Sequence, residues 1–270
     1  MKDAKSLAFP ISAVTIAIGG FLAQFYGFKV PLILGILINA VGIIVIASIP
    51  EYEFKKLEVP YHLHVLHSFR ELLKPNIFWL IMVSIFVGMS INQFRKFFEP
   101  YLAEILASSL KTTMMRTLGI LGIVEALVKS IPKIVGVRLK EEWSKIAYSL
   151  APVTIPMLTA LSVVLPNPAF IVALGIIATV VNTAYSFNFG IELQTRIPSE
   201  KRATILSLNS MLAALIMATF YAIYGIVVDK LTLPKARLLF ALMLLVVGVI
   251  VKALERMEIL KEALNLKHLG

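Results

Sequence analysis

Eight stretches of about 20 mostly apolar residues divide this 270-residue chain, and they constrain its fold more than any other feature. A helix of that length crosses the hydrocarbon core of a bilayer and satisfies its own backbone hydrogen bonds there. The stretches cover residues 7–26, 30–49, 76–93, 117–137, 146–165, 169–190, 203–228 and 236–251. We therefore expect an all-α membrane protein with about eight transmembrane helices.

The composition agrees with a chain that lies in a lipid bilayer. Hydrophobic residues make up 59% and charged residues 16% of the sequence, whereas a soluble domain carries about a quarter charged residues. The net charge of +10 comes from Lys and Arg in short connectors, not from a basic face interleaved with aromatic residues, so nucleic acid is not an expected partner. The absence of cysteine excludes disulfides and thiolate metal sites.

The distribution of basic residues predicts the orientation. If the N-terminus is inside, the inner segments hold 18 of the 26 Lys and Arg residues and the outer segments hold 8. This bias satisfies the positive-inside rule with both termini cytoplasmic, as expected for a protein of the cell membrane. The expected outer loop 94–116 is an exception with four basic residues, and its acids Glu99 and Glu104 offset them only partly.

We expect four regions along the chain. Residues 1–50 would form two transmembrane helices, residues 51–75 a cytoplasmic connector, residues 76–258 a six-helix bundle, and residues 259–270 a cytoplasmic tail.

Within the connector, the segment 61–74 predicts an amphipathic helix on the cytoplasmic membrane surface. Its apolar residues recur at steps of three and four; they are Leu63, Leu66, Phe69, Leu72 and Leu73. The same segment carries His62, His64 and His67, but only His268 remains elsewhere to complete a metal site. We interpret these histidines as surface residues, because a metal needs three or four ligands brought together in space.

Polar residues are distributed unevenly among the expected spans. The second, fifth and eighth spans are almost purely aliphatic, whereas the third, fourth, sixth and seventh carry the polar side chains. Polar groups inside a membrane are costly and face a cavity or another helix. The pattern suits three-helix repeats in which one helix faces lipid and two face a central path, as in many secondary transporters.

Short motifs stand in a fixed order along the same chain. They are Gly19-Gly20-Phe21-Leu22-Ala23, Tyr26-Gly27-Phe28-Lys29-Val30-Pro31, Ile49-Pro50-Glu51, Pro100-Tyr101-Leu102, Arg202-Ala203-Thr204-Ile205-Leu206-Ser207 and the segment 225–229. With the alternation of polar and apolar spans, they resemble the major facilitator superfamily, and most closely its drug-efflux-like branch.

The resemblance implies that the eight spans correspond to the family's fifth through twelfth helices. The fold would then be a partial major facilitator fold, with the last two helices of the N-terminal half and the complete six-helix C-terminal half. Two features depart from the family. Ala17-Ile18 precedes Gly19-Gly20, where the antiporter signature has Gly-Pro. The family's diagnostic loop has only a weak counterpart, at residues 136–140.

Glu125 and Lys129 form the sharpest candidate site. They are spaced i to i+4 and so share a face of the fourth span. Glu125 could be a protonatable group that couples proton movement to transport, with Lys129 as its neighbour. Two structural interpretations stay open: an ion pair between packed helices, and a Lys129 side chain that extends to the cytoplasmic surface.

A second set of polar residues could line a substrate cavity. Asn182, Tyr185, Asn188 and Glu192 follow one face of the sixth span, which the resemblance places along the cavity. A seam of hydrogen bonds between helices explains the same spacing.

Three further residues belong to the same cavity hypothesis. Asn92 and Gln93, near Arg95, could line the outer mouth or simply mark the end of the third span, and Asn209 lies on the seventh.

The sequence favours a secondary transporter that moves a small solute by alternating access, with proton-coupled efflux as one form of it. No glycine motif of the kind that binds nucleotide phosphates is present, so neither ATP nor another cofactor is expected. The alternative is a truncated remnant or split-gene subunit, inactive without a separate four-helix N-terminal partner or a second copy. An enzyme is not expected, because no span pairs carboxylates with histidines or a nucleophile with a base.

Overall fold

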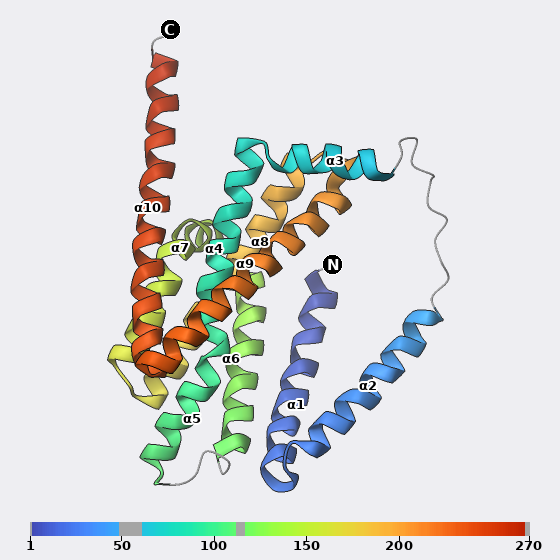
Figure 1. Ribbon diagram of the computed structural model, residues 1–270, viewed down its shortest axis with the longest axis vertical. Helices are drawn as coiled ribbons and strands as arrows, with labels where there is room; N and C mark the ends of the chain where they lie inside the picture. The colour runs from blue at the N-terminus through green and yellow to red at the C-terminus, as the bar shows by residue number, and fades with distance from the viewer. Residues whose placement is uncertain (1, 49–60, 112–116, 268–270) are drawn as a thin grey trace.

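The computed structural model describes residues 2–48, 61–111 and 117–267, and every element in these ranges is a helix (Figure 1). The helices are α1 (Lys2–Tyr26), α2 (Lys29–Ala47), α3 (Tyr61–Leu72), α4 (Pro75–Lys96), α5 (Phe98–Ser109), α6 (Leu118–Arg138), α7 (Glu141–Val164), α8 (Pro168–Arg196), α9 (Arg202–Leu231) and α10 (Leu233–Lys267), with a short 3₁₀ turn at Ser199–Lys201. Side chains of residues 2–13, 61, 62, 64, 131 and 258–267 are not described. The expected motif at 49–51 and His268 also lie outside the described residues.

Six helical segments among the described residues are long and apolar enough to cross a membrane. They are α2, α4 together with α5, α7, α8, α9 with the turn before it, and α10. The predicted all-helical class is therefore confirmed, and these six segments have the length and apolarity that membrane spans require. The other two expected spans also lie in helices, but the described apolar part of α1, Val14–Tyr26, is shorter, and α6 carries Glu125, Lys129 and Lys133.

Local sequence signals explain where several helices begin and end. Asn167 caps the start of α8: its Oδ1 accepts hydrogen bonds from the amides of Ala169 and Phe170 at 3.0 and 3.3 Å. Pro168 occupies the first turn of α8, where its missing N–H costs nothing. Gly27 has φ +72°, a left-handed conformation that reverses the chain between α1 and α2.

The outer loop expected at 94–116 contains a further helix. Only Phe97 separates α4 from α5, and both helices together form one apolar run. Phe98, Tyr101 and Leu102 are buried at helical spacing against the main core. This packing explains why the expected loop is largely helix.

The main core lies where α4, α5, α6, α7 and α8 meet. Phe94, Phe98, Ile155 and Leu174 are among its buried side chains. The fifth span does not face lipid alone: α7 packs on α4, α8 and α10 and buries residues such as Ile155, while Leu150 and Met157 stay exposed. An aliphatic helix suits packed protein and lipid equally, so apolarity alone does not distinguish the two.

Two N-terminal helices differ sharply in how they contact the rest. α1 packs along α6, and a Cβ added at Gly20 would lie 2.9 Å from the Gly122 Cα, so the two backbones approach closely. Gln24 accepts a hydrogen bond of 2.8 Å from the Gly119 amide in the first turns of α6. In contrast, α2 contacts α1 and buries no residue, and Figure 1 shows it standing apart from the bundle.

Candidate functional site

A cavity of about 510 Å³ lies between α1, the start of α2, α5 and the first half of α6. Its walls are mostly apolar and include Gly20, Phe28 and Leu121. Two carboxylates, Glu99 of α5 and Glu125 of α6, interrupt this apolar lining. A second hollow of about 240 Å³ between α4, α9 and α10 has only apolar lining residues and so offers no polar chemistry.

One lysine joins the two carboxylates of the cavity wall. Lys129 Nζ lies 2.9 Å from Glu99 Oε1 and also forms an ion pair with Glu125 one turn earlier on α6. We call these three residues the Glu99–Lys129–Glu125 triad. Their side chains are 43%, 23% and 17% exposed respectively, so the triad is partly withdrawn from the surface without being sealed.

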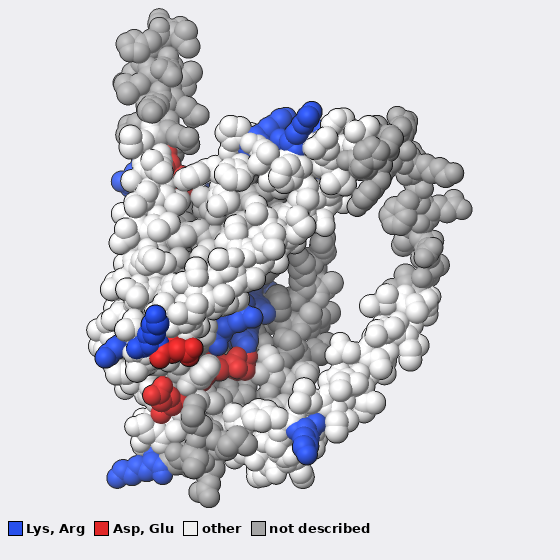
Figure 2. Space-filling view, viewed as in Figure 1, with Lys and Arg blue, Asp and Glu red and all other residues white. Residues whose placement is uncertain are grey.

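Further charges surround the triad. Arg95 at the end of α4 interacts electrostatically with Glu99, and Lys133 on α6 with Arg95 and Lys129. Figure 2 shows basic and acidic side chains gathered on the middle and lower part of the viewed face, on an otherwise largely uncharged surface. The sequence predicted the Glu125–Lys129 pair, and the structure adds Glu99 from a different helix.

The triad can hold a cation or a proton in two ways. Lys129 can remain paired with one carboxylate while the other is protonated or meets a positively charged group in the cavity. Charge inside a low-dielectric region is stabilised only by such nearby partners. The arrangement therefore provides two exchangeable states at the wall of a cavity.

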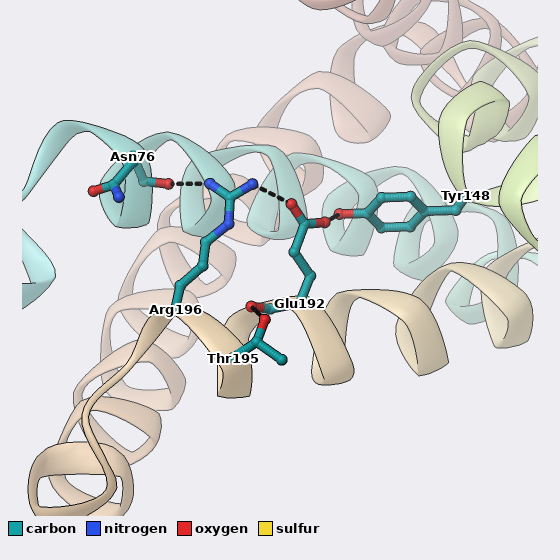
Figure 3. A network of polar contacts seen from close by, with 5 residues as sticks. All are labelled: Asn76, Tyr148, Glu192, Thr195 and Arg196. Carbon is teal, nitrogen blue, oxygen red and sulfur yellow. Dashed lines mark hydrogen bonds and ion pairs between the residues drawn. The ribbon is translucent and has the colours of Figure 1, made fainter.

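The Glu192 end of the predicted stripe on α8 meets Tyr148 of α7 (Figure 3). Tyr148 of α7 donates a hydrogen bond to the Glu192 carboxylate, which also pairs with Arg196. The Arg196 guanidinium donates in turn to the Asn76 carbonyl of α4 at 3.1 Å. Glu192 thus ties α7 and α8 together, and through Arg196 it reaches the start of α4.

The remaining stripe residues extend this contact between helices. Asn188 Nδ2 donates to Ser144 Oγ of α7 at 2.7 Å. The Tyr185 ring is buried and stacks on the Tyr148 ring at 5.1 Å between centroids. Asn182 is half-buried, one turn away. The observed bonds match the hydrogen-bond seam that the spacing left open, and the assignment of these residues to a cavity remains a prediction.

Gln93 belongs to a third polar cluster, on the side of the molecule opposite α3. Its Nε2 donates to the Arg237 carbonyl of α10 at 2.9 Å. The Arg237 side chain is completely buried and donates to the Phe97 carbonyl at 2.8 Å and to Ser162 Oγ at 3.3 Å. Its guanidinium also lies over the Tyr101 ring at 4.9 Å. Within the described residues no carboxylate forms an ion pair with it.

We call this set of residues the Arg237 cluster. Arg237 lies near the start of α10, and its side chain is in the protein interior. Helix α4 ends at Lys96, one residue before the Phe97 carbonyl, so the guanidinium lies at the negative end of that helix. Neutral acceptors and ring faces therefore replace an acidic partner.

The predicted site residues form separate groups and do not converge on one cavity. Asn92 donates to the Gly88 carbonyl of its own helix, 2.8 Å away. Asn209 Oδ1 on α9 is buried and has no hydrogen-bond partner in the described part of the chain. Glu125 alone among these residues lines the larger cavity. The same described part brings no three potential metal ligands together.

The sequence analysis assigned no role to two residues of these clusters. Glu99 fell in a segment expected to be a loop, although an acid four residues after Arg95 was a signal for a helical pair. Arg237 was the single arginine in the otherwise apolar stretch 236–251. An ionisable residue in such a stretch is a functional or structural candidate by default.

No protein-family model matches the chain, no curated protein matches its sequence, and no solved structure matches it. Its function is therefore inferred from the geometry of its own residues.

Proposed function

We propose that the chain is a secondary active transporter that moves a small solute across the cell membrane by alternating access. The observation that carries this proposal is the Glu99–Lys129–Glu125 triad on the wall of an apolar cavity, and Glu99 belongs to an apolar helical run of membrane-spanning length. Ionisable groups at membrane depth mark ion and substrate pathways. The cavity of about 510 Å³ has the size of a small-molecule site.

Proton coupling is the form of transport that the triad supports. Glu125 is the less exposed carboxylate, and we assign the coupling proton to it. When Glu125 is protonated, Lys129 keeps its second partner, Glu99, and no unpaired lysine is left in the wall. A solute and a proton could then compete for the same carboxylate, which is the simplest physical basis for exchange.

The proposed topology has eight spans, namely α1, α2, α4, α6, α7, α8, α9 and α10, with both termini cytoplasmic. α1 and α2 would represent the N-terminal half of a partial major facilitator fold, and the cavity lies where α1 and the start of α2 meet α5 and α6. The close α1–α6 contact would then join the two halves, and alternating access would change the angle between them.

A second candidate function is that of a subunit that needs a separately encoded helical partner or a second copy. Two surfaces favour it: α2 buries no residue, and α9 is the least buried candidate span of the six-helix bundle. Asn39 lies at the middle of α2, and Ser207 and Ser210 lie on α9, all exposed. Polar groups at such positions commonly bond to a neighbouring membrane helix.

Flux measurements in proteoliposomes test the first function directly. The purified chain is reconstituted with an imposed proton gradient, and transport of lipophilic dyes is followed, beginning with ethidium. We expect gradient-driven flux that falls at least tenfold in Glu125→Gln, because the neutral amide cannot exchange a proton. Glu104→Gln is the matched control, since Glu104 is an exposed acid of α5 that does not line the cavity.

The outcomes separate the two functions. Flux that is unaffected by Glu125→Gln overturns the coupling role of the triad. Flux equal to that of empty liposomes for every dye overturns transport by the chain alone. In that case, co-reconstitution with a candidate partner tests the subunit function.

A further inference from the structure

Helix α3 presents three different surfaces along its length. Ser68 and Leu72 are buried, and on this side α3 contacts α9 and α4. Figure 1 shows α3 lying across the ends of the spans, nearly perpendicular to α4. A helix in this position is placed to lie in the plane of a membrane surface.

The second surface of α3 is apolar and exposed. It consists of Leu63, Leu66 and Phe69, continued by Leu73 just after the helix, and these side chains are 38–50% exposed. At 100° per residue they occupy one arc next to the buried arc. No described residue covers this arc, although Ser68 and Leu72 on the neighbouring arc are buried.

The third surface is cationic and borders the apolar arc. Arg70 and Lys74 lie at its edge, both exposed. Glu71 pairs with Lys74 and, at 3.5 Å, with Lys201 of the turn before α9. The hydrogen bond from Lys74 lowers the pKa of Glu71, so this carboxylate stays ionised between the two lysines. Arg70 forms no ion pair with any described residue, and its charge is left for an external partner.

Continuity with the spans identifies what covers the apolar arc. Phe78 and Trp79 are exposed in the first turns of α4, directly after α3 in the chain. Tryptophan residues such as Trp79 concentrate where a membrane meets water. The exposed apolar surface of the spans thus continues onto α3, and cations lie beside it, the arrangement found in helices that bind anionic membrane surfaces.

We propose that α3 is a lipid-docking helix that binds anionic phospholipids of the leaflet on its side of the molecule. Leu63, Leu66 and Phe69 lie among the upper acyl chains, and Arg70 binds the phosphate groups. The Glu71–Lys201 pair then connects the docked helix to the turn between α8 and α9. This inference stands independently of the transported solute.

A fluorescence experiment on the full chain tests where α3 lies. The chain has no cysteine, so single-cysteine variants carry one label each. Leu66→Cys and His67→Cys are labelled with an environment-sensitive dye in phosphatidylcholine vesicles that contain 30% phosphatidylglycerol. We expect lipids with brominated acyl chains to quench the label at position 66 at least threefold more than the label at 67, and aqueous iodide to show the reverse order.

The anionic preference is measured at position 66 by brominating either the phosphatidylglycerol or the phosphatidylcholine. One cation near an anionic surface gives about fivefold enrichment, and we expect enrichment of that order around α3. Arg70→Gln should reduce it to near one, whereas Arg138→Gln, at an exposed arginine ending α6, should not.

Three results would overturn the proposal. Equal iodide quenching at both positions would place the arc in water. A label at 66 that neither iodide nor bromolipid reaches would show that protein covers it. Enrichment unchanged by Arg70→Gln would remove the headgroup contact.

Discussion

Two cations within this helical bundle are held in opposite ways. Arg237 is completely buried, and carbonyl, hydroxyl and ring groups surround it. Lys129 is partly exposed, and two carboxylates at a cavity wall hold it. Both lie in a chain whose surroundings are otherwise apolar, yet only one of them meets groups that can change their charge.

The difference separates a structural role from a chemical one. The neutral acceptors around Arg237 have no alternative protonation state near neutral pH, so protonation does not change their contacts with the guanidinium. The carboxylates around Lys129 can gain or lose a proton and so can exchange partners. Four substitutions test this contrast, in order of decreasing expected effect.

Replacement of the buried cation should have the largest effect, and on stability. In Arg237→Met the Phe97 carbonyl and Ser162 Oγ lose a charged donor, and a buried acceptor without a donor costs about 1–3 kcal/mol. We expect unfolding to become easier by about 3 kcal/mol, measured by thermal unfolding in detergent. An unchanged or higher midpoint would mean that desolvation of the guanidinium outweighs its bonds.

The same replacement at the other cation should affect transport more than folding. In Lys129→Met the two carboxylates can still reach water or the cavity, so we expect a stability loss below about 1 kcal/mol. Flux should fall about tenfold, equivalent to about 1.4 kcal/mol. Equal losses of stability in Arg237→Met and Lys129→Met would show that the two cations do not differ in their structural role.

Loss of the amide that supports Arg237 should have a smaller effect. Gln93→Leu removes the hydrogen bond to the Arg237 carbonyl but keeps the volume of the side chain. We expect a loss of about 1 kcal/mol in stability, with flux per folded molecule unchanged. A selective loss of flux would instead favour the predicted cavity role of Gln93.

The smallest effect is expected at the more exposed carboxylate. Glu99→Gln leaves Lys129 paired with Glu125, and Glu99 itself is 43% exposed. We expect flux to fall about twofold to threefold, or roughly 0.5 kcal/mol, less than in Glu125→Gln. The reverse order would move the coupling proton from Glu125 to Glu99.

The sequence located the helices well because length, apolarity and turn residues act locally. The Asn167 cap and the Gly27 turn are examples of signals that need no knowledge of neighbouring helices. The amphipathic α3 was likewise found from spacing alone.

Contacts between helices were harder to predict. An aliphatic sequence packs against protein or lipid equally well, so the packing of α7 against α4, α8 and α10 could not be predicted from its composition. Arg237 is stable inside because α4 ends beside it, and no local pattern reports which helix end will be near. The stripe from Asn182 to Glu192 has the periodicity of a cavity wall and of a seam alike, and its bonds to Ser144 and Tyr148 of α7 could not be predicted from the sequence.

The glycine contact between α1 and α6 has a mechanical consequence. Where Gly20 meets Gly122 the two backbones approach closely, and next to this contact the Phe21 and Gln24 side chains of α1 pack against Gly119 of α6. The glycines let the two helices lie close together, and the hydrogen bond from the Gly119 amide to Gln24 holds their relative position. A bulkier residue at either glycine would force these two helices apart, because its Cβ would clash with the backbone of the opposite helix.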